Sequence, residues 1–180
     1  MKSALKEIIS GSIYILVILS LTYLLVHFVG QRTVVQGSSM MDTLENGDNL
    51  ICDKITYRFR APKRYEIIVF PFQYENHTYF IKRIIGLPGE TVRIDDQGVI
   101  YINGQKLKDG YGREVIKDPG RARTEITLGK DEYFVMGDNR NNSMDSRTDA
   151  VGNIHRSKII GRVVFRIWPF AKWGSVLPGK

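Results

Sequence analysis

The sequence predicts a mainly β domain, built of antiparallel sheets, behind one N-terminal transmembrane helix. The helix is predicted because 24 consecutive residues, from Ile8 to Gln31, contain no Asp, Glu, Lys or Arg. The β domain is predicted because the rest of the chain is divided into short runs of β-branched and aromatic residues separated by turn residues. The connections between these runs are too short for the crossover helices that parallel strands need. We therefore expect antiparallel pairing.

The apolar segment Ile8–Val29 is long enough to cross a bilayer. A helix of 22 residues rises roughly 33 Å, against about 30 Å for the hydrocarbon core. The main alternative is a cleavable secretory signal, whose apolar region runs roughly 7–15 residues and ends at a small-x-small site. The segment here is longer, and residues 29–34 (VGQRTV) make a poor cleavage site. We therefore predict an uncleaved anchor.

The charges beside this segment predict its orientation. Lys2 and Lys6 precede it and only Arg32 closely follows it, which favours a cytoplasmic N-terminus. We expect a single-pass protein of the cell membrane, with residues 1–7 cytoplasmic, 8–29 in the bilayer and 30–180 extracytoplasmic.

The net charge limits the expected binding partners, and the cysteine content limits the expected disulfides and metal sites. The chain carries a net charge of +7, which favours contact with anionic headgroups. Nucleic acid is not an expected partner, because no basic helix or aromatic RNA-binding motif is present. The single cysteine, Cys52, excludes an internal disulfide and disfavours a cysteine metal cluster.

The extracytoplasmic part contains seven candidate strands. They cover residues 49–55, 66–70, 78–85, 91–94, 99–102, 132–136 and 162–168. Turn pairs such as Asn46-Gly47 and Asn103-Gly104 separate them. Residues 106–124 are polar and without pattern, and we expect a loop or small insertion there.

One of the candidate strands carries an unusual lysine. Strand alternation places Lys82 on the face of Phe80 and Ile84, and Arg83 on the opposite face. Desolvation on an apolar face would lower the pKa of the Lys82 amine and make it available as a base. The alternative is an edge strand whose lysine extends into water.

The histidines give little support to a histidine-dependent site. His27 lies in the apolar segment, His77 lies in a polar turn and His155 lies near the C-terminus. A Ser-His-Asp triad is not excluded by spacing. However, neither a G-x-S-x-G nucleophile motif nor an H-E-x-x-H zinc motif occurs. A Ser–Lys pair is the remaining economical arrangement, and it requires no metal or cofactor.

Three motifs in order resemble the type I signal peptidases, the membrane-anchored serine proteases that remove signal peptides from exported proteins. The motifs are the segment from Gly37 to Leu44 (GSSMMDTL), the segment from Lys82 to Glu90 (KRIIGLPGE) and the segment from Gly137 to Arg147 (GDNRNNSMDSR). The resemblance covers nearly the whole chain, and the single anchor and compact domain resemble the short form typical of Gram-positive bacteria.

The resemblance implies roles for individual residues. Ser39 would be the nucleophile and Lys82 the general base. The Ser39 N–H would stabilise the oxyanion, helped by the Ser38 hydroxyl, because Gly37 stands where some members have a hydroxyl. Ser143 would hydrogen-bond and orient Lys82, Asp145 and Arg147 would form a supporting ion pair, and Asp138 and Asn139 would shape the turn.

The resemblance also implies the substrates. They would be exported pre-proteins with small residues at the −1 and −3 positions, commonly Ala-x-Ala. Met40, Met41 and the aromatic segment Phe165–Trp173 would either contact lipid headgroups or pack in the core.

One residue departs from the family pattern. Asp42 stands where the family usually has proline. The Asp42 carboxylate could pair with a cation or raise the pKa of Lys82. We interpret it as a sign of specialised substrates or altered turnover. A catalytically silent homologue that binds pre-proteins or acts in surface assembly is the alternative. A self-cleaving repressor with a Ser–Lys dyad is less compatible, since a membrane anchor stands where its DNA-binding domain would be.

Overall fold

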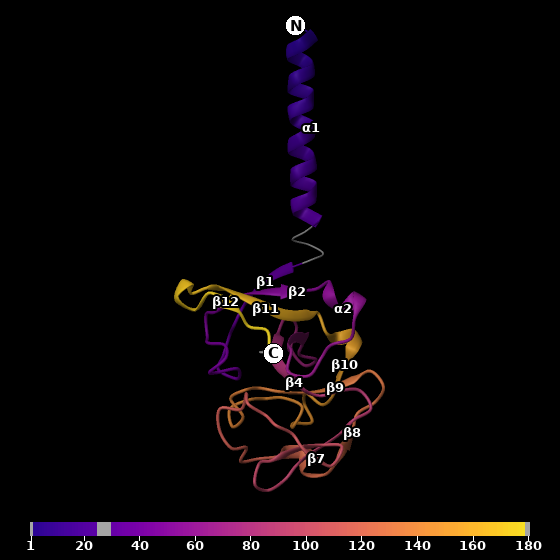
Figure 1. The fold of residues 1–180 in the computed structure, drawn as a ribbon, viewed down its shortest axis with the longest axis vertical. Coiled ribbons are helices and arrows are strands. Elements are labelled where there is room, and N and C mark those ends of the chain that lie inside the picture. Colours follow the sequence, from indigo (N-terminus) through magenta and orange to yellow (C-terminus); the bar gives the residue numbers. More distant parts are fainter. Residues whose placement is uncertain (1, 25–29, 179–180) are drawn as a thin grey trace.

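A computed structural model describes residues 2–24 and 30–178 as one long helix followed by a β domain (Figure 1). The helices are α1 (Lys2–Leu24) and α2 (Thr56–Phe59), with 3-10 turns η2 (Gly120–Arg123), η3 (Arg156–Lys158) and η4 (Phe170–Lys172). The strands are β1 (Gly30–Val34), β2 (Asn49–Asp53), β3 (Ile67–Pro71), β4 (Tyr79–Gly86), β5 (Thr91–Ile94), β6 (Ile100–Ile102), β7 (Gln105–Lys106), β8 (Ile126–Thr127), β9 (Glu132–Met136), β10 (Ile154–His155), β11 (Gly161–Trp168) and β12 (Gly174–Ser175).

Helix α1 occupies most of the predicted membrane segment. None of the described helices is both long and apolar enough to cross a membrane. The last part of the predicted span, residues 25–29, lies outside the described residues, as does His27.

The larger sheet has eight strands in the order β1-β2-β11-β3-β4-β9-β10, with β12 paired to β11. Its strand pairs are antiparallel, as the short connections predict. Strand β4, which carries Lys82, lies between β3 and β9, with Lys82 opposite Ile68. The interpretation of this segment as an edge strand is therefore wrong.

The smaller sheet has four strands in the order β7-β6-β5-β8 and lies at the end of the domain away from α1 (Figure 1). The segment 106–124, expected as a loop or insertion, joins β7 to β8. Between Lys106 and Thr124 the described chain contains only the 3-10 turn η2. Ile116 and Ala122 nevertheless pack into the core, which ties this segment to the domain.

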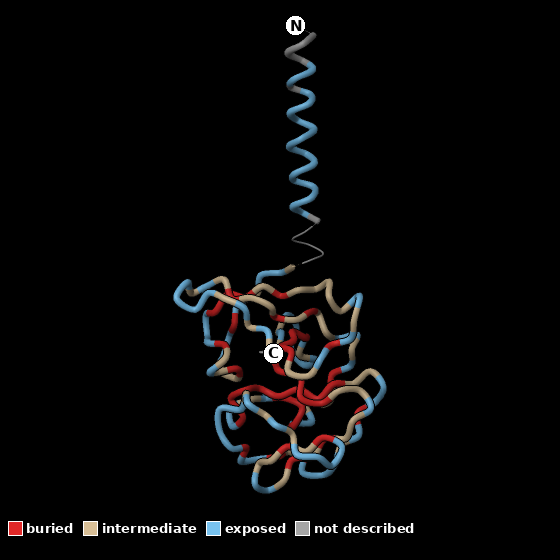
Figure 2. Tube along the Cα trace, in the orientation of Figure 1, coloured by how far each residue is buried: buried red, intermediate tan, exposed pale blue. Residues whose placement is uncertain are grey.

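Three apolar clusters make up the core. One joins the smaller sheet to β4 and β9, and the other two lie around β3 and β4. Buried residues are concentrated in the central strands, whereas the described side chains of α1 are exposed along its length (Figure 2). Because β3, β4 and β9 are covered on both faces, their side chains have little freedom to move.

Each of the seven candidate strands corresponds to an observed strand, with ends that differ by at most two residues. The strands that the sequence did not reveal are β1, β7, β8, β10 and β12. Four of these have two residues each, which is too short for an alternating pattern. Strand β1 (GQRTV) contains only two β-branched residues and lies directly after the apolar segment.

Candidate active site

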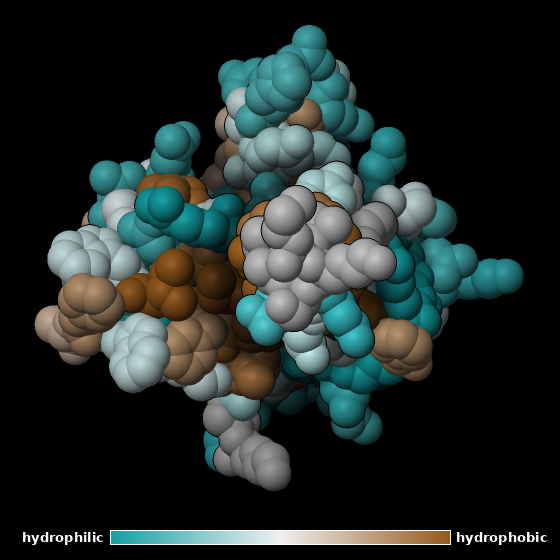
Figure 3. Space-filling view, turned by 90° about the horizontal axis from the view of Figure 1, so that it is seen from above, coloured by the Kyte–Doolittle hydropathy of each residue, from teal (hydrophilic) through white to brown (hydrophobic). Residues whose placement is uncertain are grey.

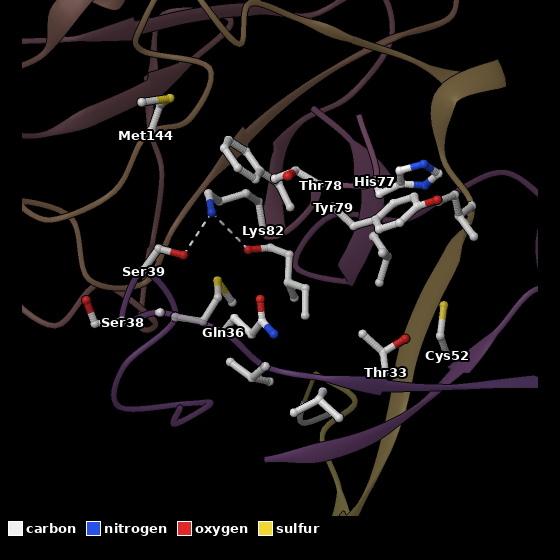
Figure 4. A pocket seen from close by; sticks show the side chains of 18 of the residues that line it. Thr33, Gln36, Ser38, Ser39, Cys52, His77, Thr78, Tyr79, Lys82 and Met144 are labelled. Atoms are coloured by element: carbon white, nitrogen blue, oxygen red, sulfur yellow. Dashed lines mark hydrogen bonds between the residues drawn. The ribbon is translucent and has the colours of Figure 1, made fainter. Parts of the chain in front are cut away.

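Ser39 and Lys82 lie in contact although 43 residues separate them in the sequence. The Lys82 Nζ donates a hydrogen bond of 2.8 Å to Ser39 Oγ and one of 3.2 Å to the carbonyl of Ile81. The two side chains point toward each other at one end of a groove (Figure 4). The Nζ atom also lies 4.7 Å from the centre of the Phe80 ring, on the strand face that alternation predicts.

Burial gives Lys82 the properties of a base. The residue is 4% exposed, and this desolvation lowers the pKa of its amine to about 8. The nearby Asp145 carboxylate acts in the opposite direction and raises this pKa. A pKa near 8 leaves a substantial neutral fraction around neutral pH, which can accept the proton of a hydroxyl.

The segment from Gly137 to Arg147 holds the serine in place. The backbone N–H of Asn139 donates to the Ser39 carbonyl at 3.0 Å. The Asn139 side chain donates to the Ser38 carbonyl at 3.1 Å, and Asn142 donates to Ser38 Oγ at 3.0 Å. The sequence assigned no such contacts to these asparagines. Because Ser38 Oγ accepts from Asn142, its own hydroxyl proton is left to donate.

The predicted ion pair is formed within this segment. Arg147 donates to both carboxylate oxygens of Asp145 at 2.8 Å, and both side chains are buried. Asp145 also accepts from the Gly137 N–H at 3.0 Å, and Arg147 donates to the Arg140 carbonyl at 2.6 Å. Two charge-assisted bonds in a fixed geometry make this pair a rigid support for the turn.

Two expected interactions differ in the structure. Ser143 does not hydrogen-bond to Lys82, because its buried Oγ has no hydrogen-bond partner among the described residues. Asp42 is exposed and lies 3.8 Å from the Arg113 guanidinium. The carboxylate that acts on Lys82 is Asp145 and not Asp42, so the charge that replaces the family's proline is directed away from the dyad.

A second buried ion pair connects the segments that carry the dyad. Arg83, next to Lys82, donates to both oxygens of Asp138 at 2.8 and 2.6 Å. Thr43, four residues after Ser39, donates to the same carboxylate at 2.5 Å. The sequence placed Asp138 in a turn and assigned no role to Arg83. The signal that could have found the pair was an arginine inside a strand that is buried on both faces.

The groove extends from the dyad between two parts of the chain. Its volume is about 620 Å³, and its walls are formed by residues 31–40 and 77–82. Cys52, Val69 and Ile160 line it between the walls, and Met144 lies near the dyad. Desolvation raises the pKa of the Cys52 thiol to about 12, so this cysteine is not a nucleophile near neutral pH. Met40, considered as a headgroup contact, is instead buried in the core beside the groove.

Comparison with known proteins agrees with this geometry. The model of the family described as "Signal peptidase, peptidase S26" matches residues 6–168. The chain belongs to this family. The resemblance indicated by the motifs is confirmed, and the chain is an enzyme of the peptidase class.

Proteins similar to this signal peptidase family member come from several bacteria. A probable signal peptidase I-2 of Synechocystis is 42% identical over 152 residues, which cover 82% of this chain and 67% of the relative. Signal peptidase I T of Bacillus subtilis is 37% identical over 163 residues, which cover 87% and 83% of the two chains. The crystal structure of a signal peptidase I from Enterococcus faecalis is 32% identical with a TM-score of 0.43, covering 57% of this chain and 97% of that one.

Gly137 lies where a side chain would disturb the candidate site. A Cβ at this position would lie 2.3 Å from Ser143 Oγ and 2.4 Å from the Ser39 carbonyl oxygen. We expect Gly137→Ala to lower kcat by about a hundredfold, because the carbonyl that positions Ser39 must move. Gly110→Ala is the matched control, since a Cβ there meets nothing within 4 Å. Wild-type kcat in the Gly137→Ala protein, measured on a peptide substrate, would contradict this interpretation.

Proposed function

We propose that the chain is a membrane-anchored serine endopeptidase that removes signal peptides from exported pre-proteins after small-x-small sites. Ser39 is the proposed nucleophile and Lys82 the proposed general base. The observation that carries this proposal is the 2.8 Å contact between Ser39 Oγ and a buried lysine whose pKa is about 8. It requires no cofactor and no metal.

The proposed reaction uses the lysine twice. Neutral Lys82 takes the proton of Ser39 Oγ as the oxygen attacks the scissile carbonyl, and the resulting ammonium gives that proton to the leaving amine. A water then hydrolyses the acyl-enzyme ester by the same route. The Ser39 N–H and the Ser38 hydroxyl would stabilise the oxyanion. The Gly37 N–H does not contribute, since it donates to Asn46 Oδ1.

The groove supports the proposed preference for small residues. An extended peptide between the two walls would place alternate side chains toward the groove floor. Near the dyad the groove is lined by Val35, Met40, Val69 and Ile81. These apolar side chains suit the methyl group of alanine at the −1 and −3 positions.

Exposed apolar side chains support the membrane placement. Helix α1 presents apolar side chains that are half or more exposed, such as Ile13, Leu16 and Leu19. In the view from above, apolar side chains gather on the β11–β12 side of the domain, while hydrophilic side chains dominate the α2 side (Figure 3). The exposed apolar side chains of the β11–β12 hairpin and η4 include Trp168, Phe170 and Trp173. Water does not favour such patches, whereas a bilayer and its interface do. With Lys2 and Lys6 inside, the β domain lies outside the cell.

The experiment that tests the proposal is cleavage of a membrane-inserted pre-protein by the purified full chain. A substrate with Ala at −1 and −3 should be cut after the −1 residue, and Phe at −1 should lower the rate at least about tenfold. The Ser39→Ala chain is the blank, and Thr124→Ala, on the surface away from the groove, is the matched control. A folded wild-type chain that cuts no pre-protein would identify a silent homologue instead.

A further inference from the structure

A second hollow, on the other side of Ile160 from the active-site groove, has no part in the proposed reaction. Its volume is about 510 Å³. Its lining includes Lys54, Tyr57, Arg58, Asp131, His155 and Arg156. Three cations thus face one carboxylate in the same hollow. Most basic side chains on a protein surface are isolated from one another and fully solvated. Several basic side chains that line one hollow are a different arrangement, because they can bind the same anion.

The acidic groups next to this hollow are already paired. The Asp53 carboxylate accepts hydrogen bonds from the Arg162 side chain at 3.1 Å and from the backbone N–H of Thr56 at 3.0 Å. The Glu66 carboxylate accepts from Arg60 and from Arg162. Both carboxylates are therefore engaged with arginines that do not line the hollow.

The hollow has a partly fixed geometry. The backbone N–H of Arg156 donates to the Asp131 carbonyl at 2.7 Å. The Arg156 Nη2 donates to the carbonyl of Tyr57 at 3.2 Å and of Arg60 at 3.4 Å. These bonds hold the guanidinium on the wall of the hollow, so little conformational entropy is lost when an anion binds to it.

The hollow lies where the chain enters the domain from α1. Gly30, the first residue of β1, is paired with Asp53, and Lys54 is the next residue. Five residues separate α1 from β1, a distance of at most about 20 Å even when they are fully extended. Helix α2, which carries Arg58, lies at this end of the domain (Figure 1). Phe59, the neighbour of Arg58, is 82% exposed.

We propose that this hollow binds the phosphate of an anionic phospholipid headgroup. Arginine and lysine side chains recognise phosphate oxygens, and an exposed phenylalanine beside them suits the boundary between headgroups and acyl chains. The hydrophilic α2 side would then hold headgroups while the β11–β12 side contacts apolar lipid. The inference rests on the membrane placement in the proposed function and is independent of the peptidase reaction.

The test measures lipid binding directly. The full chain carrying Ser39→Ala is kept in a neutral detergent, and native mass spectrometry measures the Kd of phosphatidylglycerol, phosphatidylcholine and inorganic phosphate. We expect one bound phosphatidylglycerol, held roughly tenfold or more tighter than phosphatidylcholine. Lys54→Gln with Arg58→Gln should weaken phosphatidylglycerol binding at least about tenfold. Because cleavage is not measured, failure here and failure of the peptidase proposal are separate results.

A matched pair of substitutions distinguishes a specific lipid-binding site from general electrostatic attraction between the basic domain and an anionic lipid. Lys106→Gln with Arg123→Gln removes the same charges from exposed positions at the smaller sheet. This pair should leave the Kd within about twofold, because exposed charges at that distance are screened. Equal weakening by both pairs, or equal binding of the two lipids, would overturn the proposal. Displacement of the lipid by an equal concentration of inorganic phosphate would also overturn it, in favour of a free phosphate site.

Discussion

Replacing Lys82 by Met is expected to lower the cleavage rate by about 10²–10⁴-fold while the fold is retained. Methionine keeps most of the length and apolar contacts of the lysine stem but cannot accept the proton of Ser39 Oγ. Burying a neutral side chain in place of a desolvated amine does not destabilise the site. The measurement is kcat/KM on a small-x-small peptide, with the unfolding midpoint measured alongside. Lys106→Met, at an exposed position on β7, is the control and should keep the wild-type rate.

The pH dependence of the wild-type rate follows from the same lysine. Only neutral Lys82 accepts a proton, and its pKa is about 8. Hence kcat/KM should rise about tenfold per pH unit below this value and level off above it. In Asp42→Asn the midpoint should stay in place, because Asp42 is exposed and paired with Arg113. A midpoint that falls in Asp42→Asn would show that this carboxylate does act on the base.

How much of this arrangement could be predicted from the sequence depends on the range of each interaction. Alternation within β4 correctly grouped Lys82 with Phe80, because that pattern is local. The pairing of β4 with both β3 and β9 is not local, and so the sequence could not exclude an edge strand. The same holds for Arg83, whose partner Asp138 lies 55 residues away.

Among the residues around the dyad, local contacts could likewise be predicted from the sequence and non-local ones could not. The Asp145–Arg147 contact spans two residues and follows from the motif. The absence of a hydrogen bond between Ser143 and Lys82, and the close packing of Gly137 against Ser143 and Ser39, arise from the folded turn and have no signal in the sequence. The direction of Asp42 likewise depends on Arg113, a residue in the segment that the sequence described only as a loop.

Removing one charge from the Arg83–Asp138 pair is the second substitution with a large expected effect. Both side chains are almost completely buried, and Asp138 binds Arg83 through two oxygens. Asp138→Asn leaves the Arg83 guanidinium without its counterion in a region of low dielectric constant. A change of this kind destabilises a protein by about 3–5 kcal/mol. We expect that loss in the free energy of unfolding of the full chain, measured in neutral detergent.

Two further variants show whether the loss comes from burial of the charge. Asp96→Asn removes one partner of the exposed Arg123–Asp96 pair and should change the free energy of unfolding by less than about 1 kcal/mol. Arg83→Met combined with Asp138→Leu removes both charges and should recover part of the loss, because no unpaired charge is then buried. Similar losses for Asp138→Asn and Asp96→Asn would contradict this account. If the double variant is stable but slow, the buried pair positions Thr43 and β4 for catalysis, since it connects the segments that carry Ser39 and Lys82.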